Sequence, residues 1–192
     1  MSADFHALPS QTIGPFYHFS LTVNPALACM AGPGAKGERI HLELRILDGD
    51  DRPIPDAMIE LWQADAEGKY QHPDDPQNIL PDPGFTGFGR SATDDAGVCR
   101  FETIRPGPVP DGAGRIQAPH INVSIFARGL LSRLATRVYF AGDPRLADDP
   151  VFQLVPSDRR ATLIAEPDPD VPARWKLDVH LQGDRETVFF DL

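Results

Sequence analysis

Cysteine, positive charge and long apolar runs are all scarce in this sequence. Only Cys29 and Cys99 occur among its 192 residues, far apart and outside any Cys-x-x-Cys motif, which predicts two reduced thiols. The 18 basic residues face 28 acidic ones, and the net charge of −10 disfavours nucleic acid and anionic membranes as partners. No apolar run approaches the roughly 20 residues of a membrane helix. Because Met1–His6 also lacks the blocks of a secretion signal, we expect a cytoplasmic protein.

Proline and glycine, in contrast, are frequent, with 20 prolines and 16 glycines in the chain. Proline at that density disfavours long helices and favours many turns between short strands. Hydrophobic residues make up 41% of the chain, which is enough for the core of one domain of this length. We therefore expect residues 1–192 to form a single domain, with an irregular N-terminal arm over 1–38 and a strand-rich core over 39–192.

Alternating apolar and polar residues predict most of the strands. In the segment 39–47 the apolar residues at even positions share one side, which would be buried. Strands are also predicted at 57–63, 90–93, 98–104, 121–126, 136–140 and 175–182. The segment 157–165 predicts the only short helix, with Ser157 as its N-cap. Seven or so strands with tight turns and little helix indicate a mainly β protein, an antiparallel β-sandwich.

Two segments interrupt this pattern. Residues 64–90 show no good periodicity, and a loop of that length in a compact domain is usually functional. The segment 105–110 has prolines at three of its six positions, which excludes regular structure in this interpretation. We therefore expect long loops between some of the strands.

The stretch Pro119–Asn122 has the spacing of a metal site but lacks one ligand. Residues two apart on a strand point to the same face, so a His-x-His pair there could hold one transition-metal ion. Here His120 is followed two positions later by Asn122, whose neutral amide is a poor ligand for a hard cation. A lone histidine on a strand is usually a structural residue, so His120 by itself predicts a satisfied polar group.

Several longer segments resemble the intradiol ring-cleaving dioxygenases. These segments are 53–70, which includes Glu60-Leu61-Trp62-Gln63-Ala64-Asp65, and 89–94, 105–108, 118–121, 136–140 and 183–191. The likeness covers nearly the whole chain, and its motifs are too long for chance to explain. It implies the sandwich fold of that family.

In this family, ferric iron is held by two tyrosinates and two histidines, because phenolate is a hard anionic donor that stabilises Fe(III). Matched to those four positions, this sequence keeps only His120. The first tyrosine would fall near Gln77 or Asn78, the second position holds Val109, and the second histidine is Asn122. The resemblance therefore implies that this chain alone supplies neither catalytic residues nor a metal site.

The resemblance implies instead a non-iron (alpha) subunit that works with a homologous beta subunit carrying Fe(III). Together they would form a higher-order oligomer that cleaves protocatechuate with O2 to 3-carboxy-cis,cis-muconate. Thr12, Gly14 and Pro15 match an arm segment that approaches the partner's iron, and Arg128 matches a residue that brings a cation to the same pocket. A guanidinium suits the substrate carboxylate because it can bind it bidentately.

Two other hypotheses remain open from the sequence. The chain could be an assembly or binding module with a transthyretin-like sandwich and no role in catalysis. Alternatively, it could hold a rewired metal site that uses His120 with Tyr70 or His72.

Overall fold

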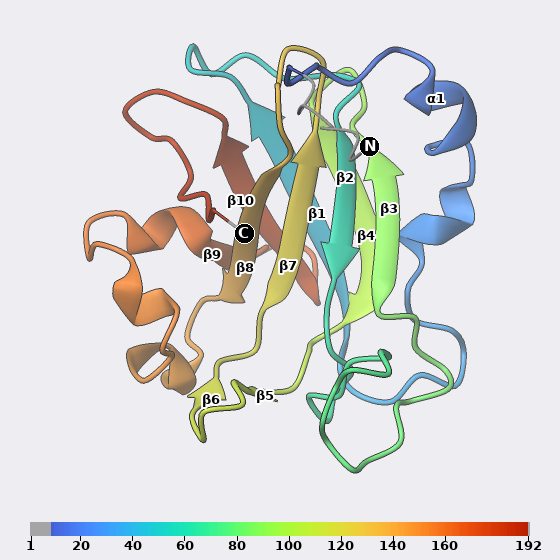
Figure 1. Ribbon diagram of the computed structural model, residues 1–192, viewed down its shortest axis with the longest axis vertical. Helices are drawn as coiled ribbons and strands as arrows, with labels where there is room; N and C mark the ends of the chain where they lie inside the picture. The colour runs from blue at the N-terminus through green and yellow to red at the C-terminus, as the bar shows by residue number, and fades with distance from the viewer. Residues whose placement is uncertain (1–8, 192) are drawn as a thin grey trace, which may run out of the picture.

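The computed structural model of the chain describes residues 9–191, so the features predicted at Met1–His6 lie outside the described residues (Figure 1). Within that range, no helix has the length and hydrophobicity needed to cross a membrane. The strands are β1 (Arg39–Leu47), β2 (Met58–Trp62), β3 (Phe88–Ala92), β4 (Val98–Ile104), β5 (Val109–Pro110), β6 (Ile116–Gln117), β7 (Ile121–Phe126), β8 (Leu134–Phe140), β9 (Ile164–Pro167) and β10 (Arg174–His180). The helices are α1 (Tyr17–Ser20) and the 3-10 helices η1 (Pro25–Ala28), η2 (Pro144–Ala147), η3 (Phe152–Leu154) and η4 (Arg160–Leu163).

One eight-stranded sheet, in the order β3-β2-β7-β8-β9-β10-β1-β4, wraps around the core. In Figure 1 the strands β3, β2, β7 and β8 form the near layer, β10, β1 and β4 form the far layer, and β9 joins the two. The edge strands β3 and β4 also contact each other, so the sheet nearly closes into a barrel. The short pair β5-β6 lies at the lower end of the molecule.

The prediction of an antiparallel β-sandwich is confirmed only in part, because the sheet is mixed and nearly closed. β1 pairs in parallel with β10, and β8 pairs in parallel with β9. Parallel neighbours need a long crossover connection, and residues 141–163 with η2, η3 and η4 provide one between β8 and β9. The fold is therefore mainly β with two layers, as expected, but its closure depends on pairings between segments far apart in the chain.

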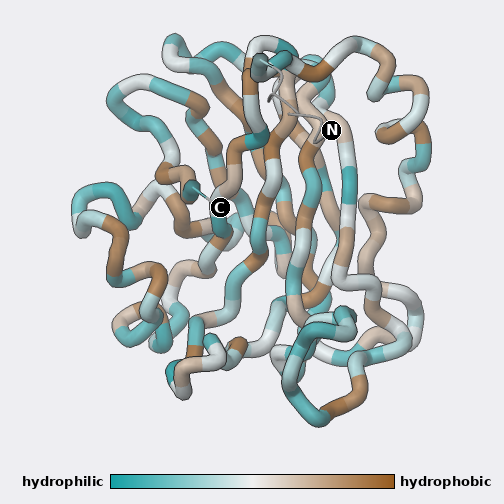
Figure 2. Tube along the Cα trace, viewed as in Figure 1, coloured by the Kyte–Doolittle hydropathy of each residue, from teal (hydrophilic) through white to brown (hydrophobic). Residues whose placement is uncertain are grey.

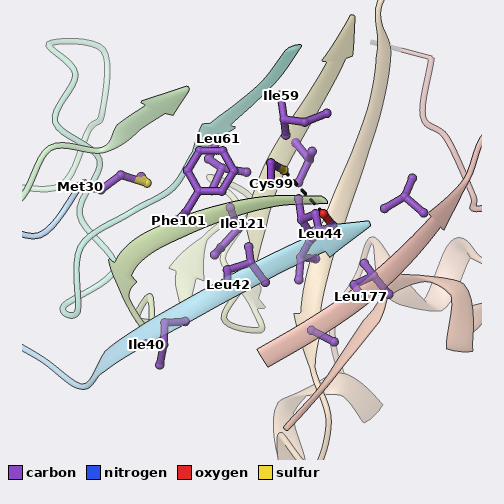
Figure 3. Packing of buried hydrophobic residues seen from close by; sticks show 14 of the residues in the cluster. Met30, Ile40, Leu42, Leu44, Ile59, Leu61, Cys99, Phe101, Ile121 and Leu177 are labelled. Atoms are coloured by element: carbon purple, nitrogen blue, oxygen red, sulfur yellow. Dashed lines mark hydrogen bonds between the residues drawn. The ribbon is translucent and has the colours of Figure 1, made fainter. Parts of the chain in front are cut away.

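The core fills the space between the two layers. Ile40, Leu42 and Leu44 of β1 are fully buried, with Phe101 beside them on the neighbouring strand β4 and Ile121 at the start of β7 in the other layer (Figure 3). Figure 2 shows hydrophobic and hydrophilic residues alternating along the strands, which is the pattern that predicted them. Burial of these apolar side chains provides the main favourable free energy of folding.

Most predicted strands are confirmed, with shifts at their ends. The segments 39–47, 98–104 and 121–126 are β1, β4 and β7 with the predicted bounds. The predicted strands 57–63, 90–93, 136–140 and 175–182 are observed as β2, β3, β8 and β10, with ends that differ by up to two residues. Strand ends are set by pairing, which the local pattern does not contain.

Three local predictions are corrected. The helix predicted at 157–165 is wrong: only Arg160–Leu163 is helical, as 3-10 helix η4, and Ile164 begins β9. Pairing of Ile164 with Tyr139 satisfies backbone groups on β8, and such tertiary pairing overrides a weak local helix preference. The predicted corner 105–110 ends in β5, and the predicted irregular arm contains α1 and η1.

The last three residues of the predicted loop 64–90 belong to β3, and the rest of this loop is held by buried polar contacts although it lacks periodicity. The Asp65 carboxylate accepts a hydrogen bond from the Lys69 amide at 3.0 Å. The Lys69 ammonium lies 2.9 Å from the Asp75 carboxylate, and these two side chains are only 7% and 5% exposed. Gly68, at φ +80°, lies so close to the 105–110 segment that a Cβ atom there would be 2.0 Å from the Pro108 oxygen.

We expect Gly68→Ala to lower the free energy of unfolding by about 2–3 kcal/mol, because it adds a backbone clash to the positive-φ strain. Gly112→Ala is the matched control, since Gly112 also has a positive φ (+77°) but open space around it. The control variant should lose only about 1 kcal/mol. Urea denaturation of both variants measures the difference, and equal losses would contradict the close approach of the two loops.

Candidate functional site

Three polar side chains form a hydrogen-bonded cluster at the start of β7. His120 is 1% exposed, and its Nδ1 donates to the Ala118 carbonyl oxygen at 2.8 Å. Its Nε2 is therefore free to accept the hydroxyl of Tyr70, whose oxygen lies 3.4 Å away. The Asn122 amide donates to the same Tyr70 oxygen and to the Trp62 carbonyl oxygen, both at 3.2 Å. The cluster satisfies its own polar groups, as expected for His120 as a structural residue.

Burial keeps the cluster uncharged at neutral pH. It lowers the pKa of His120 from 6.5 to about 4, and the nearby Arg137 guanidinium acts in the same direction. Burial also raises the pKa of Tyr70, although the Asn122 amide and Arg137 oppose that effect. Next to the cluster, burial raises the pKa of Tyr139 to about 12. The pocket therefore offers a neutral imidazole and neutral phenols.

This set of donors does not fit the ferric iron of the family. Of the two imidazoles that line the pocket, that of His72 is half exposed and accepts a hydrogen bond from the Asp74 amide, and that of His120 accepts one from a neutral phenol. Val109 contributes only hydrocarbon, and the Asn122 nitrogen has no lone pair to donate. Gln77, near the first expected tyrosine position, uses its amide to hold the Gly68 carbonyl oxygen at 2.8 Å. Across residues 9–191, no three His, Cys, Asp or Glu side chains come close enough together to hold a metal ion.

For the rewired metal site, the structure brings together only part of the proposed set. Tyr70 does reach His120, but that contact is a hydrogen bond between neutral groups. His72 is half exposed and accepts a hydrogen bond from the Asp74 amide at Nδ1, and its ring stands edge-on to Trp62 with centroids 6.4 Å apart.

The other predicted residues gather at the opposite end of β7. Six residues of extended strand span about 20 Å, and β7 runs from the His120 end beside β5 and β6 to the end where the arm crosses the molecule (Figure 1). There the Gly129 amide donates to the Thr12 hydroxyl oxygen at 2.7 Å. Thr12, Gly14 and Pro15 are all exposed on this chain.

Arg128 lies on the same end, where it meets an acidic residue that the sequence interpretation missed. The Arg128 guanidinium is 3.1 Å from the Asp56 carboxylate, and His18 approaches the same carboxylate at 3.6 Å. The Tyr17 hydroxyl donates to the Asp56 carbonyl oxygen. Burial and the Asp56 charge raise the pKa of Tyr17, so its phenol stays protonated and keeps that bond. Asp56 therefore fastens the arm and Arg128 to one turn, which is the turn that precedes β2.

The structure thus divides the predicted residues into two groups. Thr12, Gly14 and Pro15 of the arm lie on the Arg128 end, whereas Val109, His120 and Asn122 lie on the other. Besides Asp56, sequence reasoning missed Arg137, which lines the pocket around His120. Arg137 falls in the segment 136–140 of the resemblance, but it occupies an outward position on a predicted strand, as many surface arginines do, and was therefore not singled out.

Known structures with the same architecture define the class of this protein. The solved structure of catechol 1,2-dioxygenase from Acinetobacter sp. ADP1 aligns with a TM-score of 0.59 and 25% sequence identity, over 79% of this chain and 55% of that one. The nearly closed β-sheet with its pocket at one end is therefore a dioxygenase scaffold.

The particular family follows from the sequence comparisons. The sequence model of a family described as Dioxygenase matches residues 13–183. The "Protocatechuate 3,4-dioxygenase alpha chain" of Pseudomonas putida is 41% identical over 95% of both chains. The "Protocatechuate 3,4-dioxygenase beta chain" of Burkholderia cepacia is 37% identical over 95% of this chain and 73% of that one. The chain belongs to the intradiol ring-cleaving dioxygenase family.

His120 predicts a pH dependence of stability. Its pKa is lower in the folded chain (about 4) than in the unfolded one (6.5), so the unfolded state takes up the proton first as the pH falls. Stability is therefore complete above pH 6.5 and declines by about 3 kcal/mol towards pH 4. His120→Asn should remove this contribution from the slope, whatever it costs at pH 7.

The measurement is urea denaturation at pH 7 and pH 4 for the wild type, His120→Asn and His41→Asn. His41→Asn is the control for replacing a histidine with asparagine, because His41 lies exposed on β1. If wild type and His120→Asn lose equal free energy between the two pH values, His120 is not buried as a neutral imidazole.

Proposed function

We propose that this chain is the alpha, non-iron subunit of protocatechuate 3,4-dioxygenase, which cleaves protocatechuate with O2 to 3-carboxy-cis,cis-muconate. The observation that carries the proposal is the likeness to an alpha chain at 41% identity over 95% of both chains. A pocket that has lost the donors for ferric iron supports it independently. The chain would contribute to the enzyme through its shape and its arm, in the cytoplasm, with both of its cysteines free.

The partner in this proposal is a homologous beta subunit that holds the Fe(III). A beta chain with 37% identity to this chain supports two subunits of one fold, which can pack about a pseudo-twofold axis and assemble further. The exposed arm supports the same arrangement. Thr12, Gly14 and Pro15 are exposed, and a Cβ atom at Gly14 would have no other atom within 4 Å, so the arm can contact a neighbouring subunit.

Arg128 is the residue of this chain that we assign to substrate recognition. Its ion pair with Asp56 is exposed, with 60% and 48% of the two side chains accessible, and such pairs contribute only about 0–1 kcal/mol. A substrate carboxylate can therefore take over the guanidinium at little cost. Fe(III), held by the partner, would supply a Lewis acid for the catechol oxygens. Arg128 would orient the ring by its carboxylate, while the arm segment around Gly14 shields the pocket from water.

Co-expression with the homologous chain tests the assignment of the iron. Purified without a partner, this chain should bind no stoichiometric iron. With the partner it should form a complex with one iron per alpha–beta pair and a burgundy colour from tyrosinate charge transfer. Iron analysis and the visible spectrum measure both. Stoichiometric iron with dioxygenase activity in the isolated chain would contradict the proposed division between the subunits.

The role of Arg128 has its own test in the assembled enzyme. Arg128→Gln should raise KM for protocatechuate about 10- to 100-fold, since a charge-assisted hydrogen bond to the substrate is lost. Arg133→Gln is the control, because Arg133 is also exposed and lies only five positions further along the chain. Steady-state kinetics with size-exclusion chromatography separates binding from assembly. Unchanged kinetics in Arg128→Gln would favour the hypothesis of a purely structural assembly module.

A further inference from the structure

The pocket around His120 is open space of the size that proteins use for small ligands. Its volume is about 610 Å³, within the range of roughly 300–1,000 Å³ typical of ligand sites. Its wall combines Trp62 at the end of β2, residues of the loop that follows β2, the β5-β6 pair, His120 just before β7, and Arg137 of β8. It opens at the end of the molecule opposite Arg128, so it is separate from the surface assigned above to the alpha–beta site.

Arg137 of β8 brings a positive charge to this pocket without a carboxylate to balance it. Its Nη1 donates to the Gln117 amide oxygen at 2.7 Å and lies 3.4 Å from the Tyr139 hydroxyl, and both groups are neutral. Within residues 9–191 no salt bridge is formed by Arg137, although the side chain is partly buried. A partly desolvated guanidinium without an anion is an unfavourable arrangement that a bound anion would relieve.

The acidic residues near the pocket are already engaged elsewhere. Asp75 pairs with Lys69 at 2.9 Å, and Asp111 pairs with Arg115 at 2.6 Å. The remaining lining carboxylate, that of Asp74, is 90% exposed to water.

Asp149 lies behind the Tyr139 hydroxyl, which donates to it at 3.3 Å. Its carboxylate is also held by the amides of Ala118, Val151 and Phe152 at 2.6–2.9 Å. The Asp149 carboxylate therefore lowers the positive potential at Arg137 from a distance, but it forms no ion pair with the guanidinium.

The remaining wall of the pocket includes aromatic and apolar residues. Trp62 and Tyr70 stack with ring centroids 5.8 Å apart and an angle of 13° between the ring planes. Val109 and Pro110 line the pocket as well, where the family would place a tyrosine ligand. A planar apolar body fits such a wall because flat aromatic surfaces bury well against one another. The pocket thus combines one cation with an aromatic surface two strands away on the same sheet, because Trp62 and Arg137 both pair with Asn122.

We propose that this pocket binds a small aromatic carboxylate, with the carboxylate on Arg137 and the ring against Trp62 and Tyr70. The loss of the iron donors would then have turned this pocket into a metal-free binding site of the chain's own. The binding site itself uses only residues away from the Arg128 end, whereas the assembly used in its test rests on the proposed function.

Equilibrium dialysis of ¹⁴C-benzoate against the co-purified assembly tests the proposal. The wild type should bind one more benzoate per chain than Arg137→Gln does, or Arg137→Gln should weaken that site about tenfold or more. Arg145→Gln is the matched control, since Arg145 is an exposed arginine of η2 outside the pocket. Benzoate bound at the partner's iron would be common to all three proteins. Equal uptake with equal Kd by the wild type and Arg137→Gln overturns the proposal.

Two further measurements cover a variant that fails to fold and an anion site without ring selectivity. Crystals of the wild-type assembly soaked in 4-bromobenzoate should show an anomalous bromine peak beside Trp62, and a soak that labels other sites but not this pocket overturns the proposal. Inorganic phosphate should compete with benzoate at least tenfold more weakly. Phosphate that displaces benzoate from this site at equal concentration shows a general anion site and overturns the aromatic specificity.

Discussion

Strand β7 is hydrogen-bonded on both sides, and this double pairing positions the candidate functional residues at its two ends. It pairs antiparallel with β2 on one side and with β8 on the other. A strand held in two ladders cannot shift by one residue without moving its buried side chains to the wrong face. Its register sets Asn122 opposite Trp62 and Arg137, which is why the Asn122 amide reaches the Trp62 oxygen. The same pairing fixes the other end of β7, which Arg128 follows two residues later.

The polar groups at the two ends of β7 differ in burial and in charge. At the His120 end, a neutral cluster of imidazole, phenol and amide satisfies itself, because a buried donor without a partner would cost about 1–3 kcal/mol. At the Arg128 end, the groups are exposed, and water screens their ion pair. A pocket around His120 without donors for the metal, and an exposed guanidinium at Arg128, are thus consistent with a subunit that supports catalysis without holding the metal.

The loop between β2 and β3 forms part of the wall of the pocket around His120 without regular structure. Its buried Lys69–Asp75 pair replaces the backbone ladder that a strand would provide, and its approach to Pro108 requires the missing side chain of Gly68. Breaking a buried ion pair is strongly destabilising because it leaves one charge uncompensated. The wall of the pocket is therefore fixed by electrostatics and close packing together, and it does not depend on a metal ion to hold it.

The sequence by itself determined the strands and the loss of the iron donors. Two-residue alternation is a local property, so β1, β4 and β7 could be predicted with their bounds, and the replacement of a histidine by Asn122 is visible without coordinates. Only the tertiary structure decided the parallel pairings, the strand β9 in place of a helix, and the contact of Asp56 with Arg128 across 72 residues. The tertiary structure also brings Arg137 and Trp62 into the same pocket. These features come from segments distant in the chain, whose pairing free energy outweighs local preference and leaves no mark in a short stretch of sequence.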